Sequence, residues 1–228
     1  PSLLRGFSAP VKLNYAYTRD ELTFLMSNDS DSFNRWEAGN RLATQILLEI
    51  AELVENNAEI RIDERLFEAV GTNIRMALDD KKGESYDKAM LANMLTLPTE
   101  AYLIDSSAVA NVDAVSRARV TLKRELAFRF EDEFHEIFRQ NDFTGPYSPD
   151  GESIARRHLK NLALQYLVST DKPDALDICI RQLETAKNMT EESASLRELV
   201  FSGSDRAMES KEPLLLAFYE KWKLESLV

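Results

Sequence analysis

The spacing of apolar residues constrains this chain most, because from Thr18 onward they recur every three or four positions over most of its length. That period places side chains on one face of an α-helix. Only seven glycines and seven prolines among 228 residues interrupt it. Hydrophobic residues make up 44% and charged residues 29%, which is typical of an ordered, helix-rich globule. We therefore predict an all-α fold.

Capping and turn residues predict where the helices begin and end. Thr18 and Glu21 form a capping-box pattern ahead of a short helix, and Asp31 opens a long one that should end near Asn56. The loop at residues 145–150 contains a glycine and two prolines, and Asp150 can cap the helix that follows it. The predicted helices span about residues 19–27, 31–56, 63–79, 84–95, 98–104, 112–139, 151–169, 173–187, 190–200 and 211–224. The longest, 112–139, is expected to form a spine.

Helices of this length joined by short connectors favour an irregular armadillo- or HEAT-like α-superhelix of antiparallel helix pairs. Residues 7–17 differ, because apolar and other residues alternate there with the two-residue period of a short N-terminal strand. A single strand needs a sheet to join. We therefore expect residues 1–17 to end a preceding β domain and residues 18–228 to form a helical domain. Apolar residues crowd the last fifteen or so positions without a polar cap, so we expect that domain to be truncated at its C-terminal end.

Charge excludes one class of partner. The chain has 28 Lys and Arg against 39 Asp and Glu, and its formal charge of −11 repels the phosphate backbone of nucleic acids. No apolar run approaches the roughly 20 residues that cross a bilayer, so no membrane partner is expected and a cytoplasmic location is the default. The single cysteine, Cys179, excludes an internal disulfide and lies on an apolar helical face, which favours a buried, inert thiol over a nucleophile.

Catalytic motifs are incomplete in this sequence. His135 and Glu136 begin a pattern found in zinc hydrolases, but Arg139 occupies the place of the second histidine. With two histidines and one cysteine in the chain, a three-ligand zinc site would have to be assembled almost entirely from carboxylates, which is not the usual zinc chemistry. The Gly-rich phosphate loops and the Gly-x-Ser-x-Gly motif are absent, and residues 203–205 favour a turn or a helix cap over a nucleophile. We expect no catalytic residue, metal or cofactor in this chain itself.

A small basic cluster lies near the start of the helix predicted at 151–169: Arg156, Arg157, His158 and Lys160. It can grip a carboxylate or a peptide terminus, although salt bridges to neighbouring helices are the favoured interpretation. Composition alone favours an independent α-solenoid that binds a protein or peptide partner. A third hypothesis, an enzyme that uses clustered carboxylates, requires a buried pair of acids with shifted pKa values.

Five stretches together resemble one family, the zinc-dependent aminopeptidase N family, and specifically its bacterial, plant and apicomplexan alanyl aminopeptidase branch. They follow the family's order, with similar gaps, and cover nearly the whole chain. They are LLRGFSAPVKL at residues 3–13, NDSDSFNRWEAG at 28–39, TLP at 96–98, ARRHLKNLAL at 155–164 and AKNMTE at 186–191. The family usually has aspartate where this chain has Glu191. The family's zinc site and its Gly-x-Met-Glu-Asn motif are not in this chain.

The resemblance implies that a parent protein, a zinc metalloprotease, removes N-terminal residues from peptides. This chain is then its non-catalytic C-terminal helical domain, with the last strand of the β-sandwich domain before it. The domain encloses the active-site chamber and restricts peptide access, and its partners are the catalytic and β domains of the same parent chain. The resemblance places Asn188, Met189, Thr190 and Glu191 near the interdomain face or chamber wall, with Arg156 and Arg157 as further candidates. A helix-capping role for Thr190 is the alternative.

Overall fold

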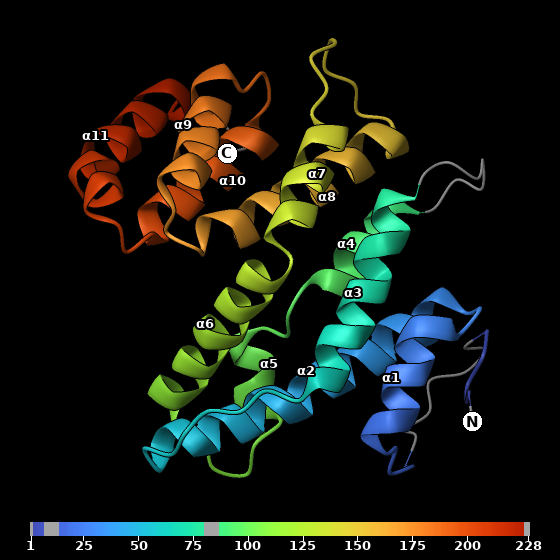
Figure 1. The fold of residues 1–228 in the computed structure, drawn as a ribbon. Coiled ribbons are helices and arrows are strands. Elements are labelled where there is room, and N and C mark those ends of the chain that lie inside the picture. Colours follow the sequence, from blue (N-terminus) through green and yellow to red (C-terminus); the bar gives the residue numbers. More distant parts are fainter. Residues whose placement is uncertain (1, 7–13, 80–86, 226–228) are drawn as a thin grey trace. The chain divides into compact units, whose positions relative to one another are not determined.

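The computed structural model describes residues 2–6, 14–79 and 87–225, and throughout them the regular structure is helical (Figure 1). The predicted all-α fold is confirmed. Of the strand expected at 7–17, residues 7–13 lie outside the described residues and residues 14–17 form no strand. The helices are α1 (Arg19–Asn28), α2 (Ser32–Glu55), α3 (Glu64–Leu78), α4 (Lys88–Leu95), α5 (Glu100–Asp105), α6 (Val112–Arg129), α7 (Glu131–Asn141), α8 (Gly151–Val168), α9 (Pro173–Thr185), α10 (Met189–Phe201) and α11 (Asp205–Trp222).

Side-chain caps set most helix starts where the sequence predicts them. The Thr18 hydroxyl accepts the backbone N–H of Glu21, whose carboxylate in turn accepts the backbone N–H of Thr18, so the capping box of α1 is complete. Asp31 caps α2 by accepting the N–H of Asn34 at 3.0 Å. Asp150 caps α8 in the same way through Ser153. Each cap satisfies a donor that the first helical turn leaves unpaired.

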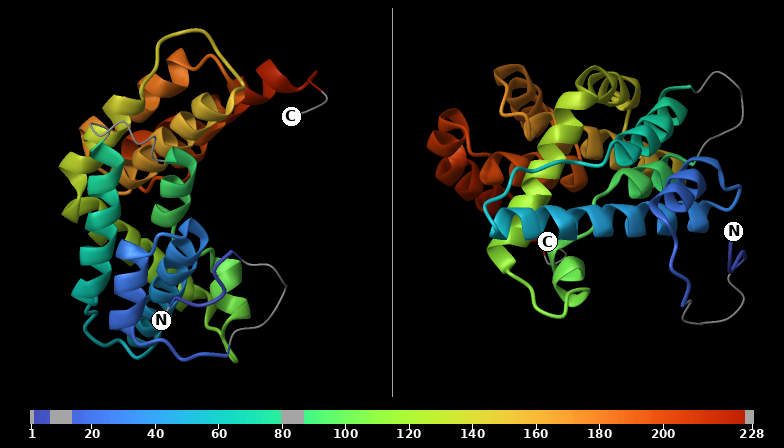
Figure 2. Two further views of the ribbon diagram at one scale, coloured as in Figure 1. Left: turned by 90° about the vertical axis from the view of Figure 1, so that its right-hand side faces the viewer. Right: turned by 60° about the horizontal axis from the view of Figure 1, so that its bottom comes forward.

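The chain divides into two compact units, Pro1–Glu133 and Phe134–Val228. In the first unit, the long helix α2 packs against α1, α4 and α6, and α3 packs against α1 and α4, as the views of Figure 2 show. The interior of this unit contains large apolar side chains that are less than 2% exposed, namely Leu22, Met26, Leu42, Ile46, Leu47, Ile50, Leu66, Ile74, Leu91, Leu103 and Leu122.

A buried polar link joins three helices of the first unit. Arg35 on α2 is 8% exposed, and its guanidinium donates to the carbonyl oxygen of Met26 on α1 and to the side-chain oxygen of Asn73 on α3. Asn73 is fully buried and donates to Ala69 within its own helix. Burying a guanidinium is costly unless its donors find acceptors, so this link fixes how the three helices approach one another.

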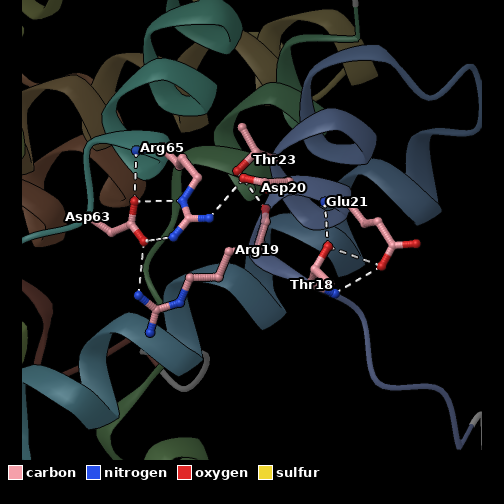
Figure 3. A network of polar contacts seen from close by, with 7 residues as sticks. All are labelled: Thr18, Arg19, Asp20, Glu21, Thr23, Asp63 and Arg65. Atoms are coloured by element: carbon pink, nitrogen blue, oxygen red, sulfur yellow. Dashed lines mark hydrogen bonds and ion pairs between the residues drawn. The ribbon is translucent and has the colours of Figure 1, made fainter.

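A second network lies at the surface of the first unit (Figure 3). Asp63 caps α3 and accepts hydrogen bonds from the side chains of Arg65 and Arg19, and Arg65 also reaches Asp20. Arg19 extends the network to Glu49 on α2. The arginine donors hold the pKa of the Asp63 carboxyl well below its usual range, Arg65 contributing most. The network ties α1 and α2 to the start of α3.

The second unit is built on α8, α9, α10 and α11, with α10 in contact with the other three. Phe134 stacks on Tyr166 with ring centroids 4.4 Å apart, and Cys179 is fully buried in the core. Its burial confirms the buried thiol predicted from the sequence and raises the pKa of that thiol to about 12, so its inertness stays a prediction. The core consists of Leu164, Val168, Leu176, Cys179, Leu199 and Ala207, with Phe138, Ile178, Ile180, Leu183 and Leu214 packed against it.

The predicted spine helix at 112–139 is two helices. The backbone leaves helical geometry at Phe130, with φ −123° and ψ 31°, and α7 restarts with three acidic residues, which are favourable in a first turn. Phe130 occupies the space beside Gly71, where an added Cβ would lie 3.1 Å from the ring. Tertiary packing of this side chain accompanies the break, and no local signal such as proline marks it.

Further boundaries differ from the predictions. Helix α4 begins at Lys88, directly after its cap Asp87, and not near 84. Helix α11 begins at Asp205 and not near 211, because Ser204 caps it by accepting the N–H of Ala207, so Pro213 falls inside the helix. Helix α5 begins at Glu100 with Thr99 as its cap, so Pro98 precedes the first turn and is not part of it. Its carbonyl oxygen instead accepts a hydrogen bond from Arg119 on α6.

Across the described ranges, none of the helices combines the length and apolar character that a bilayer crossing requires.

Candidate binding cavity

One cavity of the second unit gathers most of the site residues expected from the sequence. Its volume is about 300 Å³, and its walls come from the loop that joins α7 to α8, the first half of α8, and the junction between α9 and α10. We call it the 142–191 cavity. Of the six expected site residues, the lining includes Arg156, Arg157, Asn188 and Glu191, whereas Met189 and Thr190 do not line it.

A buried cation lies between two carboxylates in this cavity. The Lys160 side chain is 6% exposed, and its Nζ lies 2.8 Å from a carboxylate oxygen of Asp142 and 2.8 Å from one of Glu191. A buried ammonium requires such partners, because desolvation without them costs several kcal/mol. Glu191 therefore anchors α10 to α8 through Lys160. The resembled family usually has aspartate at this position.

The start of α10 is capped by Asn188. Its side-chain oxygen accepts the N–H of Glu191 at 3.0 Å, and its side-chain nitrogen donates to the Glu191 carboxylate at 2.6 Å. The first bond satisfies a backbone donor of the first helical turn, and the second bond fixes the Glu191 side chain against the cap. The capping alternative raised for Thr190 is wrong: Thr190 is the second residue of the helix and its side chain is exposed. Met189, the first residue, is half-buried.

Two buried side-chain amides, those of Gln182 and Asn161, contact the backbone at the start of α10. Gln182 on α9 donates to the side-chain oxygen of Asn161 at 2.9 Å and to the carbonyl oxygen of Glu191 at 3.4 Å. Asn161 on α8 donates to the carbonyl oxygen of Thr190. These contacts hold the 188–191 turn against α8. Lys160 and Asn161 lie in one of the stretches that resemble the family. Gln182 lies outside those stretches, and the sequence analysis did not identify it.

The two arginines of the basic cluster stack on aromatic rings of the 142–150 loop. The Arg156 guanidinium lies 4.2 Å from the ring centroid of Phe143, and that of Arg157 lies 5.0 Å from the ring centroid of Tyr147. Arg157 also donates to the carbonyl oxygen of Ser148, and Arg156 to the hydroxyl of Ser153. Sequence reasoning missed Phe143 and Tyr147, because nothing in the spacing of the loop indicates which side chains fold back onto α8.

The favoured salt-bridge interpretation of the basic cluster holds for only one member. Lys160 pairs with Asp142 and Glu191. Among the residues that the structure describes, no carboxylate lies within ion-pair distance of Arg156 or Arg157, and their contacts are with aromatic rings and neutral oxygens. The cluster therefore contains one internally neutralised cation and two guanidinium groups whose charge is not neutralised by a neighbouring carboxylate.

The remaining chemical candidates have structural partners. Nε2 of His135 lies 3.6 Å from a carboxylate oxygen of Asp174 on α9. Arg139, which stands in place of the second histidine of the zinc motif, is held by Glu136 through two hydrogen bonds. Ser204 caps α11, as the turn-or-cap interpretation of residues 203–205 predicts.

Comparison with known proteins agrees with the fold and with the resemblance. Residues 19–228 match the family model described as a domain of unknown function (DUF3458_C) with ARM repeats. The chain is similar over its full length to aminopeptidase N of Escherichia coli and of Caulobacter vibrioides, each 31% identical, and of Haemophilus influenzae, 30% identical. In each case it spans about a quarter, 25%, of the relative's length.

A solved structure extends the likeness to three dimensions. Legionella pneumophila aminopeptidase A, crystallised in complex with aspartic acid, aligns with 98% of this chain at a TM-score of 0.78 and 26% sequence identity. The aligned part is 26% of that enzyme's chain. The chain therefore belongs to the DUF3458_C family of ARM-repeat domains and corresponds to the C-terminal helical part of aminopeptidase N proteins.

Proposed function

We propose that this chain is the non-catalytic helical domain of a zinc-dependent aminopeptidase that removes N-terminal residues from peptides. In this role it encloses the active-site chamber and restricts the access of substrates. The observation that carries the proposal is the alignment of 98% of the chain with about a quarter of a larger aminopeptidase. The catalytic and β domains of the same parent chain are its partners, and zinc is the parent's cofactor. The cytoplasmic location stays a prediction.

The chain's own residues do not fit the zinc motif of the resembled family. Position 139, where that motif requires an imidazole, is an arginine, and its guanidinium is bound by Glu136. We therefore derive no catalytic step within this chain. Expressed alone, it is expected neither to bind zinc tightly nor to hydrolyse alanyl-p-nitroanilide. Stoichiometric zinc together with turnover would refute that expectation.

Reconstitution tests the proposal. The chain is mixed with the separately expressed preceding domains of its parent, and zinc-dependent cleavage of an alanyl substrate is followed alongside co-elution on a sizing column. The expected result is a stable complex whose activity differs from that of the catalytic domains alone. A chelator control shows that the activity depends on zinc. Lack of association together with unchanged kinetics favours the alternative, an independent α-solenoid that binds a protein or peptide partner.

A further inference from the structure

The 142–191 cavity carries an excess of positive charge on a strongly acidic chain. Its lining includes Arg156, Arg157, Lys160 and Lys187, against the carboxylates of Asp142 and Glu191. The whole chain, in contrast, has a formal charge of −11. A concave site lined by one sign of charge concentrates ligands of the opposite sign.

The two carboxylates of the cavity do not neutralise its arginines. Both lie 2.8 Å from the Nζ of Lys160, which is buried between them. Lys187 donates only to the carbonyl oxygen of Thr144, at 3.4 Å. Within the described ranges, the guanidinium groups of Arg156 and Arg157 and the ammonium of Lys187 thus have no carboxylate partner.

Contacts with the loop hold both arginines in place and leave some of their N–H donors without an acceptor in the described part of the chain. The guanidinium carbons of Arg156 and Arg157 lie 4.2 Å and 5.0 Å from the ring centroids of Phe143 and Tyr147, and a single oxygen accepts from each guanidinium. A guanidinium has five N–H donors in a planar fork, so each arginine keeps further donors that can bind a carboxylate. The Nε of Arg157 is itself buried and has no hydrogen-bond partner.

We propose that the 142–191 cavity binds a carboxylate group of a peptide through Arg156, Arg157 and Lys187. The assignment of a carboxylate rests on the cationic lining of the cavity and on the guanidinium and ammonium groups that have no carboxylate partner among the described residues. Only the source of that carboxylate, a peptide, rests on the function proposed above. The carboxylate can belong to the peptide's C-terminus or to an acidic side chain, since both present the same pair of oxygens to the fork.

Binding of defined peptides to this 228-residue chain tests the proposal. The probes are acetyl-trialanine with a free C-terminal carboxylate, the same peptide as a C-terminal amide, the amide with a central glutamate, and inorganic phosphate, each titrated by calorimetry or NMR. We expect the free acid or the glutamate peptide to bind roughly tenfold tighter than the neutral amide, with an affinity that falls as salt rises. The comparison of those two peptides identifies the source of the carboxylate.

Variants separate the cavity from general charge. Lys187→Gln removes an exposed side chain with one long hydrogen bond, so the fold is retained, and it is expected to weaken carboxylate binding severalfold. Arg156→Gln is expected to weaken it about tenfold. The matched control Arg197→Gln, on an exposed arginine of α10 outside the cavity that pairs with Glu198, is expected to change nothing.

Three results would overturn the proposal: equal binding of the acid and amide peptides, phosphate that competes as tightly as the best carboxylate, or affinities unaffected by Lys187→Gln and Arg156→Gln. Each leaves the reconstitution experiment untouched, because that experiment measures association of domains and turnover. Failure of the carboxylate site is thus distinguishable from failure of the proposed function.

Discussion

Glu191 shows how one residue of a recognised motif acts in this fold. Its carboxylate accepts from Asn188 within the cap of α10 and pairs with the buried Lys160 of α8. We expect Glu191→Gln to lower the free energy of unfolding by about 1–3 kcal/mol, because it removes one of the two negative charges that pair with the buried Lys160 ammonium. Urea denaturation measures the loss. The control Glu59→Gln removes an exposed pair with Arg61 and should change stability by less than about 0.5 kcal/mol. Equal effects of the two substitutions would show that Glu191 is no anchor.

Cys179 gives a second test at the scale of a single residue. Because burial raises the pKa of its thiol to about 12, almost no thiolate exists near pH 8, and the sulfur is also inaccessible. We predict no reaction with Ellman's reagent in the folded chain and one equivalent after unfolding in guanidinium. Rapid reaction of the folded chain would contradict the described packing of the second unit's core.

Capping side chains set the starts of most helices, and the cap of α3 is expected to be sensitive to pH. The arginine donors hold the pKa of Asp63 below the value of about 3.9 that an unfolded aspartate has. Its contribution to stability is therefore present above about pH 4 and is lost as the pH falls through the folded pKa. Asp63→Asn should destabilise the chain by roughly 1 kcal/mol at pH 7, and the difference from the unchanged chain should shrink below pH 4. Thermal unfolding of both at pH 7 and pH 3 measures this; a difference that grows in acid would be incompatible with the network in Figure 3.

Helix boundaries agree with the sequence-based predictions where a capping side chain sets them. They differ from those predictions where tertiary packing sets them. The Thr18, Asp31 and Asp150 caps are all formed as the residue patterns predict. The break at Phe130 was not predictable, because the apolar stripe runs through it without interruption and the packing partner, Gly71, is far away in sequence. Local patterns do not encode such long-range contacts.

At the scale of the whole molecule, the candidate cavity was only partly predictable. Of the six residues that the resemblance gave, Arg156, Arg157, Asn188 and Glu191 line it, whereas Met189 and Thr190 do not. It did not indicate that Phe143 and Tyr147 of the 142–150 loop would stack on the arginines, nor that Lys160 would take up both carboxylates and leave the arginines unneutralised. Those outcomes depend on how a loop without regular structure folds back onto α8, which apolar periodicity does not specify.

The loop itself offers a test through Gly145. A Cβ added there would lie 2.2 Å from the ring of Phe143, and the Arg156 guanidinium lies 4.2 Å from the centroid of the same ring. We expect Gly145→Ala to displace Phe143, to free Arg156 from its ring and to weaken carboxylate binding severalfold, with only a small change in melting temperature. The control is Gly151→Ala, where an added Cβ meets nothing within 4 Å. Identical behaviour of the two variants would show that the loop does not shape the cavity.

The role proposed for this chain, restriction of access to an aminopeptidase chamber, predicts discrimination between substrates of different size. The kcat/KM values of the parent's catalytic domains are compared, with and without this chain, for alanyl-p-nitroanilide and for a folded protein with an N-terminal alanine. We expect the chain to lower the kcat/KM for the protein relative to that for the anilide by about tenfold or more, because a chamber wall excludes bulky substrates. An unchanged ratio, in a complex shown to form by co-elution, would contradict it.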